Sequence, residues 1–187
     1  MNKIRTFIAI EIPPHIKKEI SEFQRHLMVR DTRISWPKPD NIHITLKFVG
    51  DVETNAITAI TEAVEKGVEQ IPPFNVKIVG VGTFPSGRKP RILWIGAKSE
   101  NSLMVKCADN IDQKLEELGY EKETRPFRAH LTLGRVKSQF KIDEVLDRLN
   151  ESRDFECDDF LASEIIVVQS TLHASGAIYT PLKRIRL

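Results

Sequence analysis

The feature that most constrains this chain is a four-residue segment that occurs twice, as His43-Ile44-Thr45-Leu46 and as His130-Leu131-Thr132-Leu133. In both copies a histidine and a threonine alternate with apolar residues. Such alternation predicts a half-buried strand, with the imidazole and the hydroxyl on one face and the apolar side chains on the other. We therefore expect two equivalent strands, each with one face in a core.

The surroundings of these strands also repeat. Each half of the 187 residues shows a helical pattern, a polar loop, the strand with the repeated segment, a second helical pattern and further strands. The helical patterns cover residues 14–28, 57–68, 104–118 and 142–149, and Gly119 is expected to end the third helix. Strands are expected over residues 4–11, 42–49, 74–82, 91–96, 129–136, 164–172 and 176–185. This order predicts an α+β fold, with two similar lobes facing each other in a single two-lobed domain over residues 1–187.

Composition narrows the class of protein. Hydrophobic residues make up 41% and charged residues 29%, with a net charge of only +2, which is too mild for bulk nucleic-acid binding and requires any basic site to be local. The two cysteines, Cys107 and Cys157, form no CxxC pair, as expected in a reducing compartment. No apolar run approaches the length of a membrane span. We expect a cytoplasmic monomer that does not bind membranes.

The repeated pair of side chains favours acid–base chemistry on a phosphate. Imidazole titrates near neutrality, so one of His43 and His130 can deprotonate an attacking water while the other protonates a leaving oxygen. The hydroxyls of Thr45 and Thr132 can donate hydrogen bonds to the phosphate oxygens. One isolated histidine on a polar strand face is usually only a solvated residue, but two copies in matching places make that reading much weaker. The residues themselves leave open which histidine is the acid.

A metal site is not expected. Each repeated segment supplies a single nitrogen ligand without a carboxylate on the same face, and no H-E-x-x-H sequence is present. Paired carboxylates, a G-x-S-x-G elbow and glycine-rich nucleotide loops are not supported either. The sequence therefore predicts catalysis with no metal and no cofactor.

Basic residues near the two histidines are candidate phosphate contacts. Strict alternation places Lys47 on the face of His43, and Arg128 on the face of His130 if that strand begins by residue 128. Arg125 and Arg135 lie close in sequence to the second repeated segment. We predict that Lys47, Arg125 and Arg128 bind substrate, although a solvated surface position is an open alternative for each. Further cations that could reach the rim of the site are Arg88, Lys89 and Arg91.

Aromatic residues have two possible roles. Alternation places Phe48 in the core together with Ile42, Ile44 and Leu46. Trp36, Phe84 and Trp94 could stack on a nucleobase, although aromatics beside strands more often belong to the core.

Longer stretches around the two segments resemble a known family, the two-histidine phosphoesterases, and in particular the RNA 2′,3′-cyclic phosphodiesterases once described as 2′-5′ RNA ligases. The similarity is densest in Arg125-Pro126-Phe127-Arg128-Ala129-His130-Leu131-Thr132-Leu133-Gly134-Arg135 and in the stretch Trp36-Pro37-Lys38-Pro39-Asp40-Asn41-Ile42-His43 that runs on to Gly50. It extends to residues 5–10, 84–94, 169–172 and 176–179. Ala129 stands where the family is expected to have proline.

The resemblance implies a bilobal fold with antiparallel sheets and outer helices around a central cleft. It implies hydrolysis of a terminal RNA 2′,3′-cyclic phosphate to a 2′-phosphate, with His43 as proton donor and His130 as proton acceptor. RNA ends or small oligonucleotides are the implied substrates, and relatives can also join 2′-5′ linkages by the reverse reaction. Two other functions remain open: a non-catalytic module that binds RNA ends, and a phosphodiesterase for another cyclic phosphate.

Overall fold

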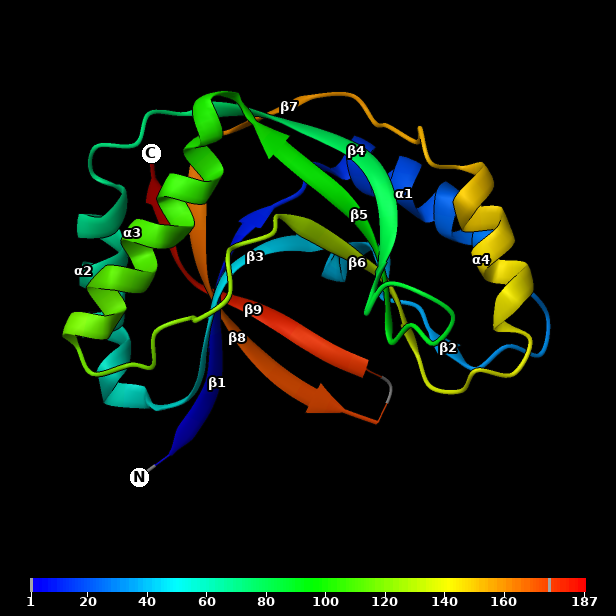
Figure 1. Cartoon of the computed structure of the whole chain (residues 1–187). Coiled ribbons are helices and arrows are strands. Elements are labelled where there is room, and N and C mark those ends of the chain that lie inside the picture. The colour runs from blue at the N-terminus through cyan, green and yellow to red at the C-terminus, as the bar shows by residue number, and fades with distance from the viewer. Residues whose placement is uncertain (1, 175) are drawn as a thin grey trace.

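Two antiparallel sheets form the centre of the molecule, as a computed structural model shows for residues 2–174 and 176–187 (Figure 1). The first sheet has the strand order β3-β1-β8-β9, and the second has the order β2-β6-β5-β4-β7. The strands of the first sheet are β1 (Lys3–Glu11), β3 (His43–Glu53), β8 (Glu164–His173) and β9 (Gly176–Arg186). Those of the second are β2 (Ile34–Ser35), β4 (Phe74–Phe84), β5 (Ile92–Ser99), β6 (His130–Val136) and β7 (Phe160–Ala162).

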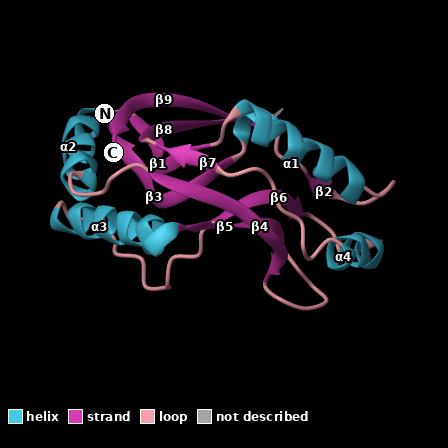
Figure 2. Ribbon diagram, turned by 90° about the horizontal axis from the view of Figure 1, so that it is seen from above, coloured by secondary structure: helices cyan, strands magenta, loops and turns pink. Residues whose placement is uncertain are grey.

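The helices lie in two pairs at opposite ends of the molecule (Figure 2). One pair is α2 (Ile57–Val68) with α3 (Leu103–Glu117), and the other is α1 (Pro14–Leu27) with α4 (Ile142–Glu151). Pro14 stands in the first turn of α1, where its missing N–H costs nothing. Gly119 adopts a φ of +88° just beyond α3, and its N–H donates to the carbonyl of Glu116. The predicted helices and the C′ glycine are confirmed.

Three strands of one sheet correspond to three strands of the other, and the two halves of the chain exchange strands between the sheets. The series β3-β1-β8 in one sheet corresponds to β6-β5-β4 in the other. Strand β4 ends the first half and pairs with β5, the counterpart of β1 that opens the second half. In the same way β8 comes from the second half and pairs with β1 of the first half. The predicted α+β fold of two similar lobes is therefore confirmed, and each lobe is built from both halves. Periodicity reports which residues are buried but carries no information on which strand pairs with which.

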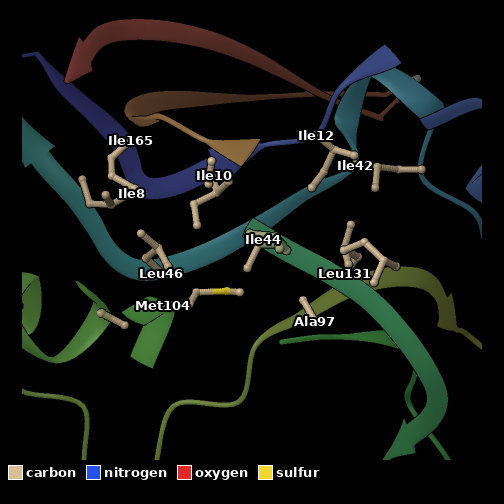
Figure 3. Close-up of a cluster of buried hydrophobic side chains, with 14 of the residues drawn as sticks. Ile8, Ile10, Ile12, Ile42, Ile44, Leu46, Ala97, Met104, Leu131 and Ile165 are labelled. Carbon is tan, nitrogen blue, oxygen red and sulfur yellow. The ribbon is translucent and has the colours of Figure 1, made fainter. Parts of the chain in front are cut away.

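One continuous apolar core joins the two lobes. Ile8 and Ile44 of the first sheet lie in the same buried cluster as Ile95 and Leu131 of the second. Figure 3 shows Ile44 and Leu131, which lie on the two histidine-bearing strands, among the side chains of this buried cluster. Since each of these side chains is completely buried, removing its apolar surface from water contributes roughly 2 kcal/mol. The core therefore fixes the strands that carry the two histidines relative to each other.

Candidate active site

The two histidines are held by the same local hydrogen bond. His43 Nδ1 lies 2.8 Å from the carbonyl oxygen of Asn41, and His130 Nδ1 lies 2.6 Å from that of Arg128. A carbonyl oxygen can only accept a hydrogen bond, so Nδ1 carries the proton in each ring. The Nε2 atom is then the nitrogen left to exchange a proton with a bound molecule. The repeat in the sequence thus corresponds in space to two imidazoles with the same tautomer.

Aromatic rings contact both imidazoles and mark one face of each sheet. His43 stacks on Phe7 at a centroid distance of 4.8 Å, and Tyr179 meets it edge-on at 5.1 Å. His130 meets Phe84 edge-on at 5.1 Å. We call these two surfaces the histidine faces: Phe7, His43, Thr45 and Tyr179 on the first sheet, and Phe84, Trp94, His130 and Thr132 on the second. The predicted aromatic neighbours Phe84 and Trp94 lie here, whereas Trp36 packs against the core.

The surroundings of His43 favour its neutral form. Burial lowers the pKa of His43 to about 4, and the positive charges of Arg135, Lys17 and His130 act in the same direction. The hydrogen bond to Asn41 opposes them only in part. The influence of His130 also shows that the two imidazoles are electrostatic neighbours. At neutral pH the unliganded site therefore holds His43 without a charge.

A β-bulge overturns two expectations about the first strand. Ile8 pairs with Lys47 and Ala9 pairs with Thr45, so Leu46 is an extra residue in β3 and the alternation shifts after it. Lys47 consequently points away from His43, is buried, forms an ion pair with Asp112 of α3 and donates to the carbonyl of Glu121 at 2.6 Å. Phe48 turns to the histidine face, 59% exposed and 5.9 Å from the Phe7 ring. The predictions that Lys47 faces the substrate and that Phe48 lies in the core were wrong.

The second strand carries the same bulge at the same distance from its histidine. Leu93 pairs with Gly134 and Trp94 pairs with Thr132, which makes Leu133 the extra residue. The shift brings Arg135, five residues after His130, to the histidine face, where its charge reaches His43. Sequence analysis identified Arg135 only as a basic residue close to the second repeated segment, and strict alternation from His130 gives no indication that it lies on the histidine face. Arg135 and Phe48 lie at equivalent positions of the repeat, each five residues after its histidine. A comparison of the two copies could therefore have indicated that this position faces the site.

Arg125 and Arg128 lie in the loop before β6. Strand β6 begins at His130, so the condition under which Arg128 would share its face through strand geometry is not met. Its carbonyl orients His130, while its side chain is exposed. Arg125 is 86% exposed and contacts Glu123 at 3.3 Å. Their role in substrate binding stays a prediction.

Neither a metal cluster nor a membrane-spanning helix is found over residues 2–174 and 176–187. Within these residues no three histidine, cysteine or acidic side chains cluster in a way that could hold a metal ion. None of the helices described there has the length and apolar character needed to cross a membrane.

Comparison with known proteins places the chain in a family. The family described as LigT-like phosphoesterase matches residues 10–94 and 96–179, two segments that correspond to the two halves of the repeat. The chain belongs to this family. The resemblance to two-histidine phosphoesterases inferred from the motifs is therefore confirmed.

Relatives agree with this assignment over nearly the whole chain. The chain is 36% identical to a protein of Methanocaldococcus jannaschii named RNA 2′,3′-cyclic phosphodiesterase, covering 96% of this chain and 99% of that protein. A protein of the same name from Methanothermobacter thermautotrophicus is 30% identical, with 99% and 100% covered. The LigT-like fold is shared with TT0787 of Thermus thermophilus, with a TM-score of 0.81, 23% identity and 98% of each chain covered. It is also shared with E. coli LigT complexed with 3′-AMP, with a TM-score of 0.78, 22% identity and coverage of 100% and 99%.

Proposed function

We propose that this phosphoesterase hydrolyses RNA 2′,3′-cyclic phosphate ends to 2′-phosphate ends by acid–base catalysis with His43 and His130. The observation that carries the proposal is the twinned imidazole arrangement, in which each Nδ1–H donates to a carbonyl two residues upstream and each Nε2 is available. The name shared by the archaeal relatives supports RNA as the substrate class. A module that only binds RNA ends needs no acid–base pair, so the twinned imidazoles favour catalysis.

In the proposed reaction one histidine takes a proton from water as the water oxygen attacks phosphorus. The bond between phosphorus and the ribose 3′ oxygen breaks, and the other histidine donates a proton to that oxygen. His130 is the proposed acceptor and His43 the proposed donor. Thr45 and Thr132 donate hydrogen bonds to the non-bridging oxygens, and Arg135 adds a positive charge beside them. With the 5′ hydroxyl of another RNA in place of water, the same steps would instead join the cyclic phosphate end to that hydroxyl in a 2′-5′ linkage, again breaking the bond to the 3′ oxygen.

If His43 is the proton donor, its imidazole must take up a proton when the substrate binds. A pKa of about 4 leaves His43 neutral at pH 7 in the unliganded site. The negative charge of a bound phosphodiester favours the protonated imidazole and opposes the effect of Arg135 and Lys17. We therefore propose that binding of the cyclic phosphate is coupled to proton uptake by His43.

The decisive experiment is product identification after incubating EDTA-treated protein with an oligonucleotide that ends in a 2′,3′-cyclic phosphate. The expected product is the 2′-phosphate. Formation of the 3′-phosphate would mean that the ribose 2′ oxygen, and not the 3′ oxygen, is the leaving group. Turnover that stops with EDTA and returns with zinc or manganese would exclude the two-histidine mechanism. Binding without turnover would favour the RNA-end module, and preference for a cyclic phosphate outside RNA would favour the third function.

A further inference from the structure

The edge of the second sheet beyond Arg135 carries exposed cations. Strand β2 pairs with β6 so that Ser35 lies opposite Arg135 and Ile34 opposite Val136. The pairing continues one residue further, because the N–H of Lys137 donates to the carbonyl of Arg33 at 2.7 Å. Arg33 and Lys137 are therefore direct neighbours across this edge.

These side chains point to the histidine face. Ile34 and Val136 pack against the core, and neighbouring residues on a strand point to opposite faces. Arg33, Arg135 and Lys137 must then lie on the side away from the core, where Arg135 already acts on His43. Lys137 stands two residues past Arg135, which extends the positive surface by roughly 7 Å.

Among the residues that the structure describes, these three cations have no acidic partners. We name Arg33, Arg135 and Lys137 the basic rim. Within the described part of the chain, none of the three forms an ion pair with a carboxylate, and the nearby Asp31 is paired with Lys141. Three neighbouring cations without acidic partners stand out in a chain whose net charge is +2.

We propose that the basic rim binds the backbone phosphates of the RNA strand that leads to the cyclic phosphate. This inference rests on the proposed function, since it is the cyclic end between the two histidines that would bring the preceding nucleotides to the rim. Long, exposed arginine and lysine side chains along a sheet edge suit a flexible polyanion, and contacts to the backbone alone are independent of base sequence. The rim makes an oligonucleotide a better substrate than a mononucleotide.

The test compares substrates of two lengths with a rim variant and a charge-matched control. The rim variant is Arg33→Gln with Lys137→Gln, which leaves Arg135 in place. The control is Lys66→Gln with Lys106→Gln, two exposed lysines on α2 and α3, at the other end of the molecule. Substrates are a nucleoside 2′,3′-cyclic phosphate and an RNA of about eight nucleotides with the same end. Fluorescence anisotropy of the labelled 2′-phosphate RNA measures binding separately from turnover.

Each phosphate contact to single-stranded RNA contributes a slope of about 0.7 to the logarithm of affinity against the logarithm of salt. The rim variant should therefore bind the octanucleotide roughly 25-fold more weakly at 0.1 M salt and lose about 1.4 from that slope. Its kcat/KM for the mononucleotide should equal that of the wild type, and the control should match the wild type on both substrates. Unchanged octanucleotide binding, or an equal loss on both substrates, would overturn the proposal. Failure of the wild type to open the cyclic phosphate of either substrate would instead contradict the proposed function, while the binding measurement would still test the rim.

Discussion

At the scale of single residues, the two imidazoles should act as a unit. Replacing His43 or His130 by alanine should lower the rate of cyclic phosphate opening by about a hundredfold to ten-thousandfold, because each substitution removes one proton transfer. The double variant should lose much less than the product of the two losses. Single-turnover rates of variants shown to be folded by circular dichroism measure both effects. Near-wild-type turnover by either single variant would remove that histidine from the mechanism.

The lowered pKa of His43 also makes a prediction for stability. In the unfolded chain its pKa is near 6.5, so between pH 6.5 and about 4 the unfolded state binds more protons than the folded state. The free energy of unfolding should therefore fall as the pH drops through this window, by at most about 3 kcal/mol. His43→Gln should abolish this part of the pH dependence, as urea unfolding at several pH values would report. The matched control is His15→Gln at an exposed position of α1, which should keep it. A His43→Gln profile identical to the wild type would contradict the assignment.

Substrate-coupled protonation can be observed directly. The imidazole of His43 should titrate near pH 4 in the unliganded protein by NMR, and saturating nucleoside 2′-phosphate should move that midpoint upward because a bound anion stabilises the imidazolium. No upward movement on ligand binding would assign the donor role to His130 instead. Either result decides which histidine is the proton donor, a question that the residues alone left open.

At the scale of elements, the bulged strand β3 depends on a buried ion pair with α3. Lys47 and Asp112 have side chains only 8% and 13% exposed. Lys47→Met should destabilise the protein by roughly 3 kcal/mol, because it leaves the Asp112 carboxylate without its cation. Adding Asp112→Leu should recover most of this loss, since two apolar side chains can replace a buried pair. Chemical denaturation of both variants provides the comparison. A double variant no more stable than Lys47→Met would show that the pair contributes more than charge compensation.

The bulges also explain how far the sequence could predict the site. The alternation that identified His43, Thr45, His130 and Thr132 holds only up to the residue before each bulge, and the strand faces predicted up to that point agree with the structure. Beyond it the faces are reversed, so Lys47 was wrongly predicted to face the substrate, and Arg135 was noted only for its closeness in sequence to the second segment. A bulge arises from how a strand pairs with its neighbour, which the residues of that strand do not encode locally. The short strands β2 and β7 were missed for a similar reason, since two or three residues show no period.

At the scale of the whole molecule, the exchanged strands and the shared core should make the two lobes unfold together. Far-UV circular dichroism reports both lobes, whereas the fluorescence of Trp36 and Trp94 reports the one containing the second sheet. We expect the two denaturation curves to coincide, as in a two-state transition. Separate midpoints would mean that each lobe is an independent folding unit and would contradict the proposal of a single domain.

The exchange of β4 and β8 has a mechanical consequence. Jaws that close around a ligand need a narrow hinge, with few connections between two bodies that can rotate. Here the backbone crosses from one lobe to the other several times, and apolar side chains from both lobes interlock between the crossings. Rotating one lobe against the other would strain many connections at once and open the packed interior. We therefore expect the enzyme to be a rigid template, in which the spacing between the two imidazoles is set when the chain folds rather than when substrate arrives.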